Sequence, residues 1–467
     1  MTTTPARRTV GIVLAAGLGT RMKSRIPKVL HPLCGRPMLD YVLDAWEGAA
    51  AADGTPSAAL VVYSPATEAL VAAMGDRATY ALQAEPRGTG DAVAAALATL
   101  GEDVDEIIVL SGDVPLVTDE DLGAILEQRR LDDAAITLAS VDAADPGHLG
   151  RIIRSEFGNV ERIVEAKDGD GDELETNEVN AGLYAFDAHW LRRRIGGLTA
   201  SAATGELYLT DLVRLAREDG RIVSAVEFED DGSFDGINDR TQLARAEWAM
   251  RVRINERHLR NGVTMRDPST VYIDWGVEFA TDVTIEPGVV VRGATKVGEG
   301  TVLGPGGTIV DSIIGRDCVV WSSVVESSTV EDRVRIGPFA HLRPGSHVGA
   351  DAEIGNFAEI KNSRLAAGVK QHHVSYLGDA ELGAGTNVGA GTITANWDGR
   401  TKHRTTIGER VFLGVDTMLV APVTIGDEAK TGAGAVVTKD VPPRKLAVGV
   451  PARIREPRPP RDPDAGA

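Results

Sequence analysis

The first half of the chain alternates short apolar runs with longer stretches in which apolar residues follow a helical spacing. Runs of four or five apolar residues have the length of buried strands. Strands that alternate with helices predict βαβ units on a mostly parallel sheet, which binds ligands at the carboxyl ends of its strands. We therefore expect an α/β domain over residues 1–238. Its clearest strands are Val10–Leu14, Ala59–Val62 and Ile107–Leu110, and its clearest helices are Gly90–Leu100 and Thr118–Arg130.

A stretch without glycine or proline, rich in arginine and alanine, follows from Asp239 to Asn261. Its length and composition predict one long helix, so we assign residues 239–262 to a linker helix. At the end of the chain, residues 456–467 are rich in proline, arginine and aspartate. We expect this short segment to be a disordered tail.

The second half of the chain follows a different period, because its apolar residues recur at every sixth position. Glycine often follows the apolar residue, as in VGEGTV, LGPGGT and IGPFAH. A period of six is typical of a hexapeptide β-helix, in which three short strands form each coil and the apolar side chains fill the interior. We predict this fold for residues 263–455. The matching positions are Ile285, Val291, Val297, Leu303, Ile309, Val330, Ile336, Leu342, Val348, Ile354 and Ile360, and then Ile407, Leu413, Leu419 and Ile425.

The six-residue repeat is interrupted twice, at Leu365–Leu377 and at Ile393–Ile407. Each coil packs only on its neighbours, so an interruption has to leave the stack as a loop. We expect two protruding loops. Together they carry side chains that the repeat otherwise lacks: His372, His373, Tyr376, Asn396, Trp397, Lys402 and His403.

Charge is distributed unevenly along the 467 residues. The whole of the formal net charge of −19 comes from residues 1–250, because acidic and basic side chains are equal in number over residues 251–467. Such a chain lacks the general basic face that nucleic acid or an anionic membrane requires. Two distant cysteines and the absence of any run of 18 apolar residues predict a cytoplasmic protein without disulfides or membrane insertion.

Within the acidic half, the first 39 residues contain seven basic side chains and no acidic one. This basic segment includes the sequence LAAGLGTRM, which follows the first predicted strand. Gly17 and Gly19 would let backbone N–H groups approach a phosphate, and Arg21 and Lys28 would neutralise its charge. The sequence is neither a P-loop nor G-x-G-x-x-G, since no GK[ST] follows and Met22 takes the last glycine position. A bare G-x-G is more often a turn, but the preceding strand and the basic segment favour a phosphate site.

LAAGLGTRM, followed by Pro27-Lys28, resembles the signature of nucleotidyltransferases that join a nucleoside triphosphate to a sugar 1-phosphate. Together with a hexapeptide β-helix, it is similar to the bacterial family of bifunctional N-acetylglucosamine-1-phosphate uridylyltransferases/glucosamine-1-phosphate N-acetyltransferases. The resemblance extends from Val10 to about Val448. It implies a Rossmann-like nucleotidyltransferase domain, a linker helix and a left-handed parallel β-helix. It also implies a homotrimer that uses Mg²⁺, UTP, N-acetylglucosamine 1-phosphate, glucosamine 1-phosphate and acetyl-CoA to make UDP-N-acetylglucosamine.

The resemblance implies a role for each matching residue of the first half. Asp113 and Asn238 would hold Mg²⁺, and Arg21 and Lys28 would act on the phosphates. Gln83, Gly88 and Thr89 would read the uracil, whereas Gly150, Glu165 and Asn180 would hold the sugar and the ribose. The remaining nucleotide-binding positions are Leu14, Ala15, Ala16, Gly17, Ser111 and Gly112.

These residue types suit the implied chemistry. A sugar phosphate attacks the α-phosphorus of a triphosphate and expels pyrophosphate, so two anions meet and need a metal and cationic side chains. Asp113, in LSGDVPL at the end of a predicted strand, offers the carboxylate oxygen that Mg²⁺ prefers. Taken alone, Asp113 is equally a turn-forming aspartate, and Glu165 and Asn180 would be assigned to the surface.

For the second half, the resemblance implies acetyl transfer to an amine. A protonated amine needs a general base, and histidine has a suitable pKa. His373 matches the family's base, and Glu359 would orient it. Arg343, Lys361 and Tyr376 would bind the sugar phosphate, and Asn387 and Asn396 the amino sugar. The acetyl-CoA channel would contain Ala390, Asn396, Trp397, Val415 and Ala433. His372 has no such role.

Two departures from the family's pattern keep an alternative open. Trp397 stands where a tyrosine is usual, and Val415 replaces a serine that contacts the acyl donor. The alternative is a sugar-1-phosphate nucleotidyltransferase whose β-helix serves only assembly or regulation. A third hypothesis, a non-enzymatic sensor of nucleotide sugars, also remains to be tested by pyrophosphate release.

Overall fold

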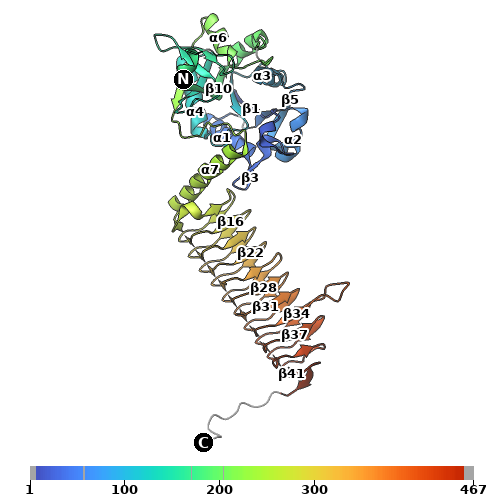
Figure 1. Cartoon of the computed structure of the whole chain (residues 1–467). Helices are drawn as coiled ribbons and strands as arrows, with labels where there is room; N and C mark the ends of the chain where they lie inside the picture. The colour runs from blue at the N-terminus through green and yellow to red at the C-terminus, as the bar shows by residue number, and fades with distance from the viewer. Residues whose placement is uncertain (1–6, 56–57, 170, 203, 457–467) are drawn as a thin grey trace, which may run out of the picture. The chain divides into compact units, whose positions relative to one another are not determined.

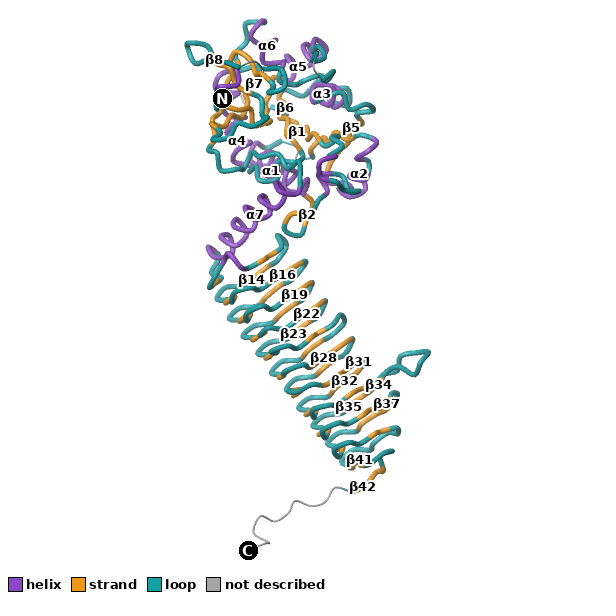
Figure 2. Tube along the Cα trace, in the orientation of Figure 1, coloured by secondary structure: helices purple, strands orange, loops and turns teal. Residues whose placement is uncertain are grey.

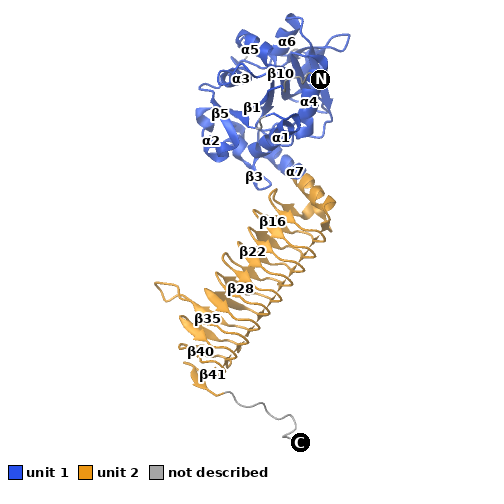
Figure 3. Cartoon of the chain, turned by 180° about the vertical axis from the view of Figure 1, so that it is seen from behind, with its two compact units in different colours: residues 1–250 blue, residues 251–467 orange. Residues whose placement is uncertain are grey.

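The computed structural model describes residues 7–55, 58–169, 171–202 and 204–456 (Figure 1). The chain divides into two compact units, Met1–Met250 and Arg251–Ala467 (Figure 3). The boundary falls within α7 (Arg240–Arg260). The presence of this helix confirms the long helix expected from Asp239 to Asn261. Apart from Glu456, the expected tail lies outside the described residues.

The first unit is built on a mixed sheet with the strand order β11–β7–β10–β6–β1–β4–β5. β5, β4, β1 and β6 run parallel, as predicted, but β10 runs antiparallel to both of its neighbours, and the hairpin of β8 and β9 adds a further antiparallel pair. The three predicted strands lie within β1, β4 and β6. The bounds are β1 Thr9–Leu14, β4 Ala59–Tyr63, β5 Ala78–Leu82, β6 Glu106–Ser111, β7 Ile136–Asp142, β8 Arg151–Arg154, β9 Val160–Val164, β10 Glu178–Asp187 and β11 Val223–Phe228.

Helices cover both faces of this sheet. On β1, the neighbouring residues Ile12 and Val13 point to opposite faces and belong to two different cores. One core contains residues of α3, α5 and α6, and the other contains residues of α1, α2 and α4. α3 and α4 confirm the two predicted helices. The bounds are α1 Met38–Asp53, α2 Ala69–Met74, α3 Thr89–Leu97, α4 Asp119–Asp132, α5 Ala188–Arg194 and α6 Asp211–Glu218.

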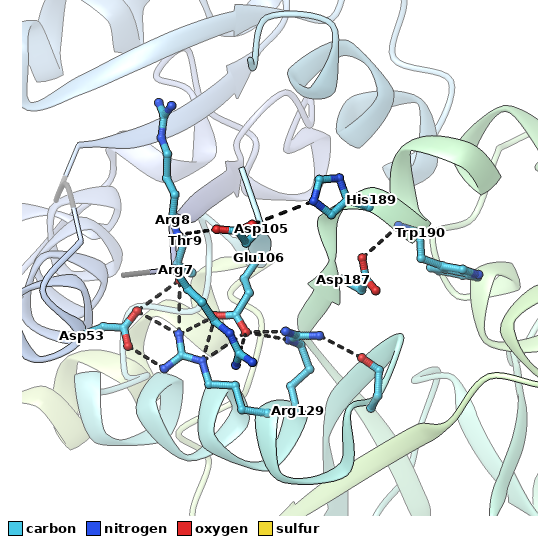
Figure 4. A network of polar contacts seen from close by, with 12 residues as sticks. Arg7, Arg8, Thr9, Asp53, Asp105, Glu106, Arg129, Asp187, His189 and Trp190 are labelled. Atoms are coloured by element: carbon cyan, nitrogen blue, oxygen red, sulfur yellow. Dashed lines mark hydrogen bonds and ion pairs between the residues drawn. The ribbon is translucent and has the colours of Figure 1, made fainter. Parts of the chain in front are cut away.

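Polar residues form a network at the amino ends of β1 and β6, away from the ligand-binding edge (Figure 4). Glu106 is fully buried there, and its carboxylate accepts hydrogen bonds from Arg129 and Arg130. Burial alone would raise the pKa of Glu106, but the hydrogen bonds from the two arginines outweigh burial and lower it. Glu106 is therefore ionised and bound on several sides.

The second unit is a stack of short coils built from three parallel sheets of 12, 10 and 9 strands, with one antiparallel strand ending the first sheet (Figure 2). Its interior is lined by the predicted apolar positions, among them Leu303, Ile336, Ile354 and Leu413, which are almost entirely buried. This arrangement confirms the hexapeptide β-helix. The predicted residues Glu359, Lys361 and Tyr376 of this unit lie on the 10-stranded sheet. The strands of this sheet are β13 Tyr272–Ile273, β16 Val290–Arg292, β19 Thr308–Val310, β22 Val324–Glu326, β25 His341–Leu342, β28 Ala358–Lys361, β31 Ser375–Gly378, β34 Ile393–Ala395, β37 Met418–Val420 and β40 Val436–Val437.

The first of the two predicted interruptions is wrong. Leu365, Gln371 and Leu377 follow one another at six-residue steps, and all three side chains are fully buried in the stack. Gln371 takes an apolar position because its side chain donates a hydrogen bond to Ser375 Oγ at 2.9 Å inside the coil. Strands β29 (Arg364–Leu365), β30 (Lys370–Gln371) and β31 therefore continue the coils without a loop.

The second predicted interruption is confirmed. Thr394 takes the six-residue position on β34, and Ile407 of β35 (Thr405–Ile407) takes the following one, thirteen positions later, with both side chains buried. The residues between them leave the stack as a loop closed by a bridge between Trp397 and Lys402, visible beside β34 (Figure 1). Asp398 holds the turn, accepting hydrogen bonds from the backbone N–H groups of Arg400 and Thr401.

Candidate functional site

Two adjoining cavities open at the carboxyl ends of β1 and β6 in the first unit. The larger has a volume of about 710 Å³ and the smaller about 480 Å³. In the sheet, β4 and β5 lie on one side of β1, and β6 lies on the other. The cavities lie where the strand order reverses in this way, which is the usual ligand site of such sheets. The two cavities share five lining residues of the predicted site, namely Arg21, Thr89, Ser111, Asp113 and Asn238. A ligand in one cavity therefore meets a ligand in the other at these residues.

The glycine loop after β1 lines the larger cavity from Leu14 to Arg21. Gly19 has a φ of +60°, and a Cβ placed there would lie 2.7 Å from Lys28 Cβ, so only glycine fits. Gly17 has open space around it, as expected for a backbone that a ligand approaches. Ser64 Oγ donates to the Ala16 carbonyl at 2.9 Å and fixes the first part of the loop.

Lys28 lines the larger cavity and contacts two residues of the shared wall. Its ammonium group contacts the carboxylate of Asp113 and donates to Asn238 Oδ1 at 3.0 Å. Asn238 is oriented by the donation of its own amide to the Gly236 carbonyl at 3.0 Å, and Gln242 Oε1 accepts its backbone N–H at 2.7 Å. Two oxygen ligands from distant parts of the sequence thus converge on one cation.

This convergence suits a hard divalent cation, because one carboxylate and one amide oxygen are typical protein ligands of Mg²⁺, which takes the others from phosphate and water. Within the described residues, three or more histidine, cysteine or acidic side chains do not gather as a metal site anywhere. A donor set of one carboxylate and one amide oxygen, as at Asp113 and Asn238, is of the kind that a phosphate-bearing ligand completes.

Gln83 and Gly88 also line the larger cavity. Gln83 is buried, and its amide nitrogen donates to the Gly88 carbonyl at 3.1 Å and to Asp91 Oδ2 at 2.8 Å. Its amide oxygen is thus left to accept from a ligand N–H. Gly88 has a φ of +112°, and a Cβ there would lie 2.5 Å from the Leu207 carbonyl oxygen. Thr89 Oγ1 accepts the Leu209 N–H at 3.0 Å.

The smaller cavity contains Gly150, Glu165 and Asn180. Burial raises the pKa of Glu165, whose Oε1 accepts from Thr210 Oγ1 at 2.9 Å. The Asn180 amide donates to Tyr184 Oη at 2.6 Å and stands at an irregularity of β10. Local sequence signals would have left both side chains on the surface, and the fold brings them to the cavity.

One predicted residue does not line either cavity. Gly112 N–H donates to the Leu14 carbonyl at 2.9 Å, and a Cβ at Gly112 would lie 3.1 Å from that oxygen. Gly112 therefore spaces the ends of β1 and β6. Several further residues of the cavity walls lie on loops whose sequence shows no recognisable spacing and did not indicate them: Lys167 and Tyr208 in the larger cavity, and Asp145, His148, Leu149, Glu229, Asp230 and Asp235 in the smaller.

The second group of predicted residues lies on the outer surface of the β-helix. Glu359 and Tyr376 are neighbours in register on β28 and β31. Glu359 Oε1 accepts from Arg343 Nη1 at 2.7 Å, and within the described chain no hydrogen bond joins Glu359 to His373. Glu359 thus pairs with Arg343 in this structure, and the orientation of His373 by Glu359 stays a prediction.

Two lysines lie beside this pair, Lys361 and Lys402. Lys402, from the protruding loop, contacts Lys361 and lowers the pKa of its ammonium, and Arg343 adds to this effect. Like charges this close to one another favour an anion between them. Lys402 was noticed in the sequence as part of the loop but not assigned to the site, because no spacing relates it to Lys361.

His373 and three predicted acyl-donor residues mark one corner of the β-helix. The N–H of Gly391 bonds to Val374 O at 2.7 Å, that of Asp416 to Ala390 O at 2.7 Å, and that of Gly434 to Val415 O at 2.8 Å. Successive coils therefore stack His373, Ala390, Val415 and Ala433 in a line. Such a straight edge suits an extended ligand.

The other predicted residues of this site differ in accessibility. Trp397 is 57 % exposed on the protruding loop. Asn396, by contrast, is buried, and its amide donates to Asp379 Oδ2 at 2.5 Å, so it supports the base of the loop. Asn387 lies on β33 (Asn387–Val388), on the sheet adjacent to Tyr376 across the corner.

Comparisons with known proteins agree with this arrangement. Residues 11–172 match the family described as MobA-like NTP transferase domain, and residues 327–362 and 404–439 match the bacterial transferase hexapeptide. A bifunctional protein GlmU from Caldanaerobacter subterraneus subsp. tengcongensis is 45 % identical over 96 % of both chains. Proteins of the same name from Enterococcus faecalis and Rubrobacter xylanophilus are each 43 % identical over 95 % of this chain and 95 % and 93 % of their own lengths. Among the described helices, none is long and apolar enough to cross a membrane.

Proposed function

This chain belongs to the family of bifunctional GlmU proteins, and we propose that it makes UDP-N-acetylglucosamine in two steps. The β-helix acetylates glucosamine 1-phosphate with acetyl-CoA. The first unit then transfers UMP from UTP to N-acetylglucosamine 1-phosphate and releases pyrophosphate. We assign residues 1–238 to the uridylyl transfer, 239–262 to the linker helix and 263–455 to the acetyl transfer, in a cytoplasmic enzyme.

The observation that carries the uridylyl transfer is the meeting of two cavities at Arg21, Asp113 and Asn238. UTP fits the larger cavity, with its uracil N–H toward Gln83 Oε1 and its phosphates along the glycine loop. The sugar phosphate fits the smaller one, with its hydroxyl groups toward Glu165 and Asn180. The α-phosphorus and the attacking phosphate oxygen then lie side by side at the shared wall.

The chemistry at this wall is the neutralisation of charge between two anions. Arg21 is exposed, lines both cavities and has no carboxylate partner in the part of the chain that the structure describes. Lys28 holds Asp113 and Asn238 in place and can turn to a phosphate when they take a metal. Bound Mg²⁺, held by Asp113 and Asn238, would supply further positive charge to the phosphates. A protein base is unnecessary because the attacking phosphate oxygen is already ionised.

In the acetyl transfer, His373 takes a proton from the ammonium of glucosamine 1-phosphate so that the amine can attack the thioester. Arg343, Lys361 and Lys402 bind the phosphate group between them. Acetyl-CoA extends along the corner formed by Ala390, Val415 and Ala433. The simultaneous presence of these groups disfavours a β-helix that serves assembly alone.

A homotrimer would cover this second site. The corner that carries His373 continues to Trp321, Phe339 and Phe357, whose side chains are 42 %, 59 % and 62 % exposed, and the two phenylalanine rings stack at 5.6 Å. We call these three residues the aromatic ridge. Apolar groups in a continuous line on a surface mark an interface. A second copy on this ridge would shield the site from water, and a monomer in sedimentation equilibrium at micromolar concentration would contradict the trimer.

Two assays on one preparation test the proposal. With acetyl-CoA and glucosamine 1-phosphate, the protein is expected to release free thiol. With UTP, Mg²⁺ and N-acetylglucosamine 1-phosphate, it is expected to release pyrophosphate. Pyrophosphate without thiol would favour the nucleotidyltransferase with an inactive β-helix, and neither product would favour a sensor.

A further inference from the structure

Arg151, the first residue of β8, is a buried arginine without an acidic partner. Its exposed fraction is 5 %, and no carboxylate lies within 4.0 Å of it in the described chain. The comparably buried Arg129 pairs with Glu106 instead. A buried charge without a counter-ion is unfavourable unless other groups satisfy it, and such exceptions concentrate at functional sites.

The partners of Arg151 are three backbone carbonyls of one short loop, residues 146–149. Nη2 donates to Gly147 O at 2.9 Å, and Nη1 donates to Pro146 O at 3.2 Å and also to Leu149 O. The planar guanidinium thus reaches across the turn that Leu149 N–H closes onto Pro146 O at 3.1 Å. These hydrogen bonds from the buried arginine hold the exposed residues 147–149 in one shape.

This loop is part of the wall of the smaller cavity. Asp145, His148, Leu149 and Gly150 all line it. The backbone carbonyl of Gly150 accepts a hydrogen bond from the N–H of Asn180 at 2.8 Å. Gly150 also lies close to Glu165, because a Cβ placed on Gly150 would be 3.6 Å from Glu165 Oε1. The carbonyls that Arg151 holds therefore adjoin the residues to which we assign the sugar.

We propose that Arg151 is a positioning residue for the sugar phosphate, which acts by holding residues 146–149 as the sugar-side wall and presenting His148 to the sugar hydroxyl groups. The inference rests on the proposed uridylyl transfer. Arg151 touches neither the larger cavity nor the shared wall, so the nucleotide is bound independently of it. Its loss should affect the KM of one substrate only.

The test compares Arg151→Met and Arg151→Lys with wild type in pyrophosphate release from UTP and N-acetylglucosamine 1-phosphate. For Arg151→Met we expect the KM of the sugar phosphate to rise about tenfold, because the loop loses charge-assisted hydrogen bonds. We expect the KM of UTP to stay within about twofold. Arg151→Lys, which keeps the charge but not the fork of donors, should fall between the two.

The matched control is Arg154→Met on the same strand. Arg154 also binds a backbone carbonyl, that of Gly158 at 2.9 Å, but its main partner is Glu178, and it lines neither cavity. Arg154→Met should leave both KM values unchanged. Equal rises in both KM values for Arg151→Met, or a fall in kcat alone, would overturn the proposal and assign Arg151 to general stability.

A second variant guards against misfolding of Arg151→Met. Gly147 has a φ of +49°, and the only atom near a Cβ there is Asp145 O at 3.9 Å. A β-branched residue is strained at positive φ, so Gly147→Val distorts the loop without disturbing the interior. We expect a several-fold rise in the KM of the sugar phosphate alone, and an unchanged KM would overturn the proposal. If wild type itself releases no pyrophosphate, the proposed function fails instead.

Discussion

The two candidate sites are built in opposite ways. The site of the first unit lies in two cavities, and its residues come from loops spread between Leu14 and Asn238 that the sheet brings together. The site of the β-helix lies on an open corner, and its residues repeat from coil to coil. The first site encloses its ligands within one chain, whereas the second offers one wall. A stack of repeated coils thus presents one open surface, and a second chain packed against that surface would be needed to form a pocket.

The largest effect is expected from one substitution that should impair pyrophosphate release and leave thiol release intact. Lys28→Ala removes the cation that contacts Asp113 and Asn238 at the wall shared by both cavities. We expect kcat for pyrophosphate release to fall about 10²–10³-fold, as when one electrostatic contact to the reacting groups is lost. Thiol release should stay within about twofold, because the β-helix is unaltered.

The reciprocal control is Lys361→Ala on β28. It should impair thiol release with glucosamine 1-phosphate and leave pyrophosphate release unchanged. Loss of both activities in either variant would contradict the independence of the two sites.

The next prediction concerns the open corner. The double variant Phe339→Asp/Phe357→Asp replaces two exposed rings of the aromatic ridge by carboxylates. We expect the proposed trimer to dissociate, as measured by sedimentation velocity. Thiol release should fall about 10²-fold, since the site loses the wall that positions its ligands. Pyrophosphate release should persist, because the cavities of the first unit are complete within one chain.

Ile313→Asp provides the control for this pair. Ile313 is 53 % exposed on β20 (Ile313–Ile314), which belongs to the nine-stranded sheet and not to the ridge. The variant should remain trimeric and active. A double variant of the ridge that is monomeric and still releases thiol at the wild-type rate would show that one chain suffices for acetyl transfer.

The sequence predicted those site features that follow from local patterns and missed those that depend on contacts between distant segments. The glycine loop and the strand-end Asp113 could be found because their positions follow from the ends of apolar runs. The six-residue period likewise located the coils and the loop at Trp397. The period failed at Gln371 because a polar side chain takes the interior position there. Its amide nitrogen donates to Ser375 Oγ, whereas its buried amide oxygen has no hydrogen-bond partner in the described part of the chain.

Other features depend on contacts between distant segments, which leave no local pattern. The pair between Glu359 and Arg343 and the approach of Lys402 to Lys361 arise only when coils stack. The hairpin of β8 and β9 places Arg151 opposite Val164, the residue before Glu165. Periodicity predicts which face a residue takes but not which charged neighbour it meets there.

A further prediction contrasts the stability of the two units. Glu106 is buried among arginines in the first unit, so Glu106→Gln leaves the buried Arg129 without its counter-ion and leaves Arg130 with Asp53 alone (Figure 4). We expect a loss of about 3–5 kcal/mol in the free energy of unfolding of that unit. In calorimetry, its transition should move down by about 10 °C while that of the β-helix stays in place. Glu102→Gln, at an exposed glutamate nearby, should shift neither transition.

The same residue gives a pH dependence with a definite sign. Because the folded state lowers the pKa of Glu106 below 4.5, its contribution is complete above that pH and is lost as the pH falls through the folded value. Wild type should therefore lose stability of the first unit on acidification more steeply than Glu106→Gln does. Parallel curves for the two proteins would contradict the buried pair as the source.

The smallest expected effect tests the corner directly. Val415 is 49 % exposed, directly after Ala390 in the line that we assign to acetyl-CoA, and it stands where the family has a serine. Val415→Ser adds a hydroxyl group, and one hydrogen bond contributes about 0.5–1.5 kcal/mol. We expect the KM of acetyl-CoA to fall about threefold, with the KM of glucosamine 1-phosphate unchanged. Val420→Ser, at an exposed position of β37 away from the corner, should change neither. Because the corner lacks side walls within one chain, the gain should also disappear in the monomeric ridge variant, and a gain that persists there would place acetyl-CoA on a single chain.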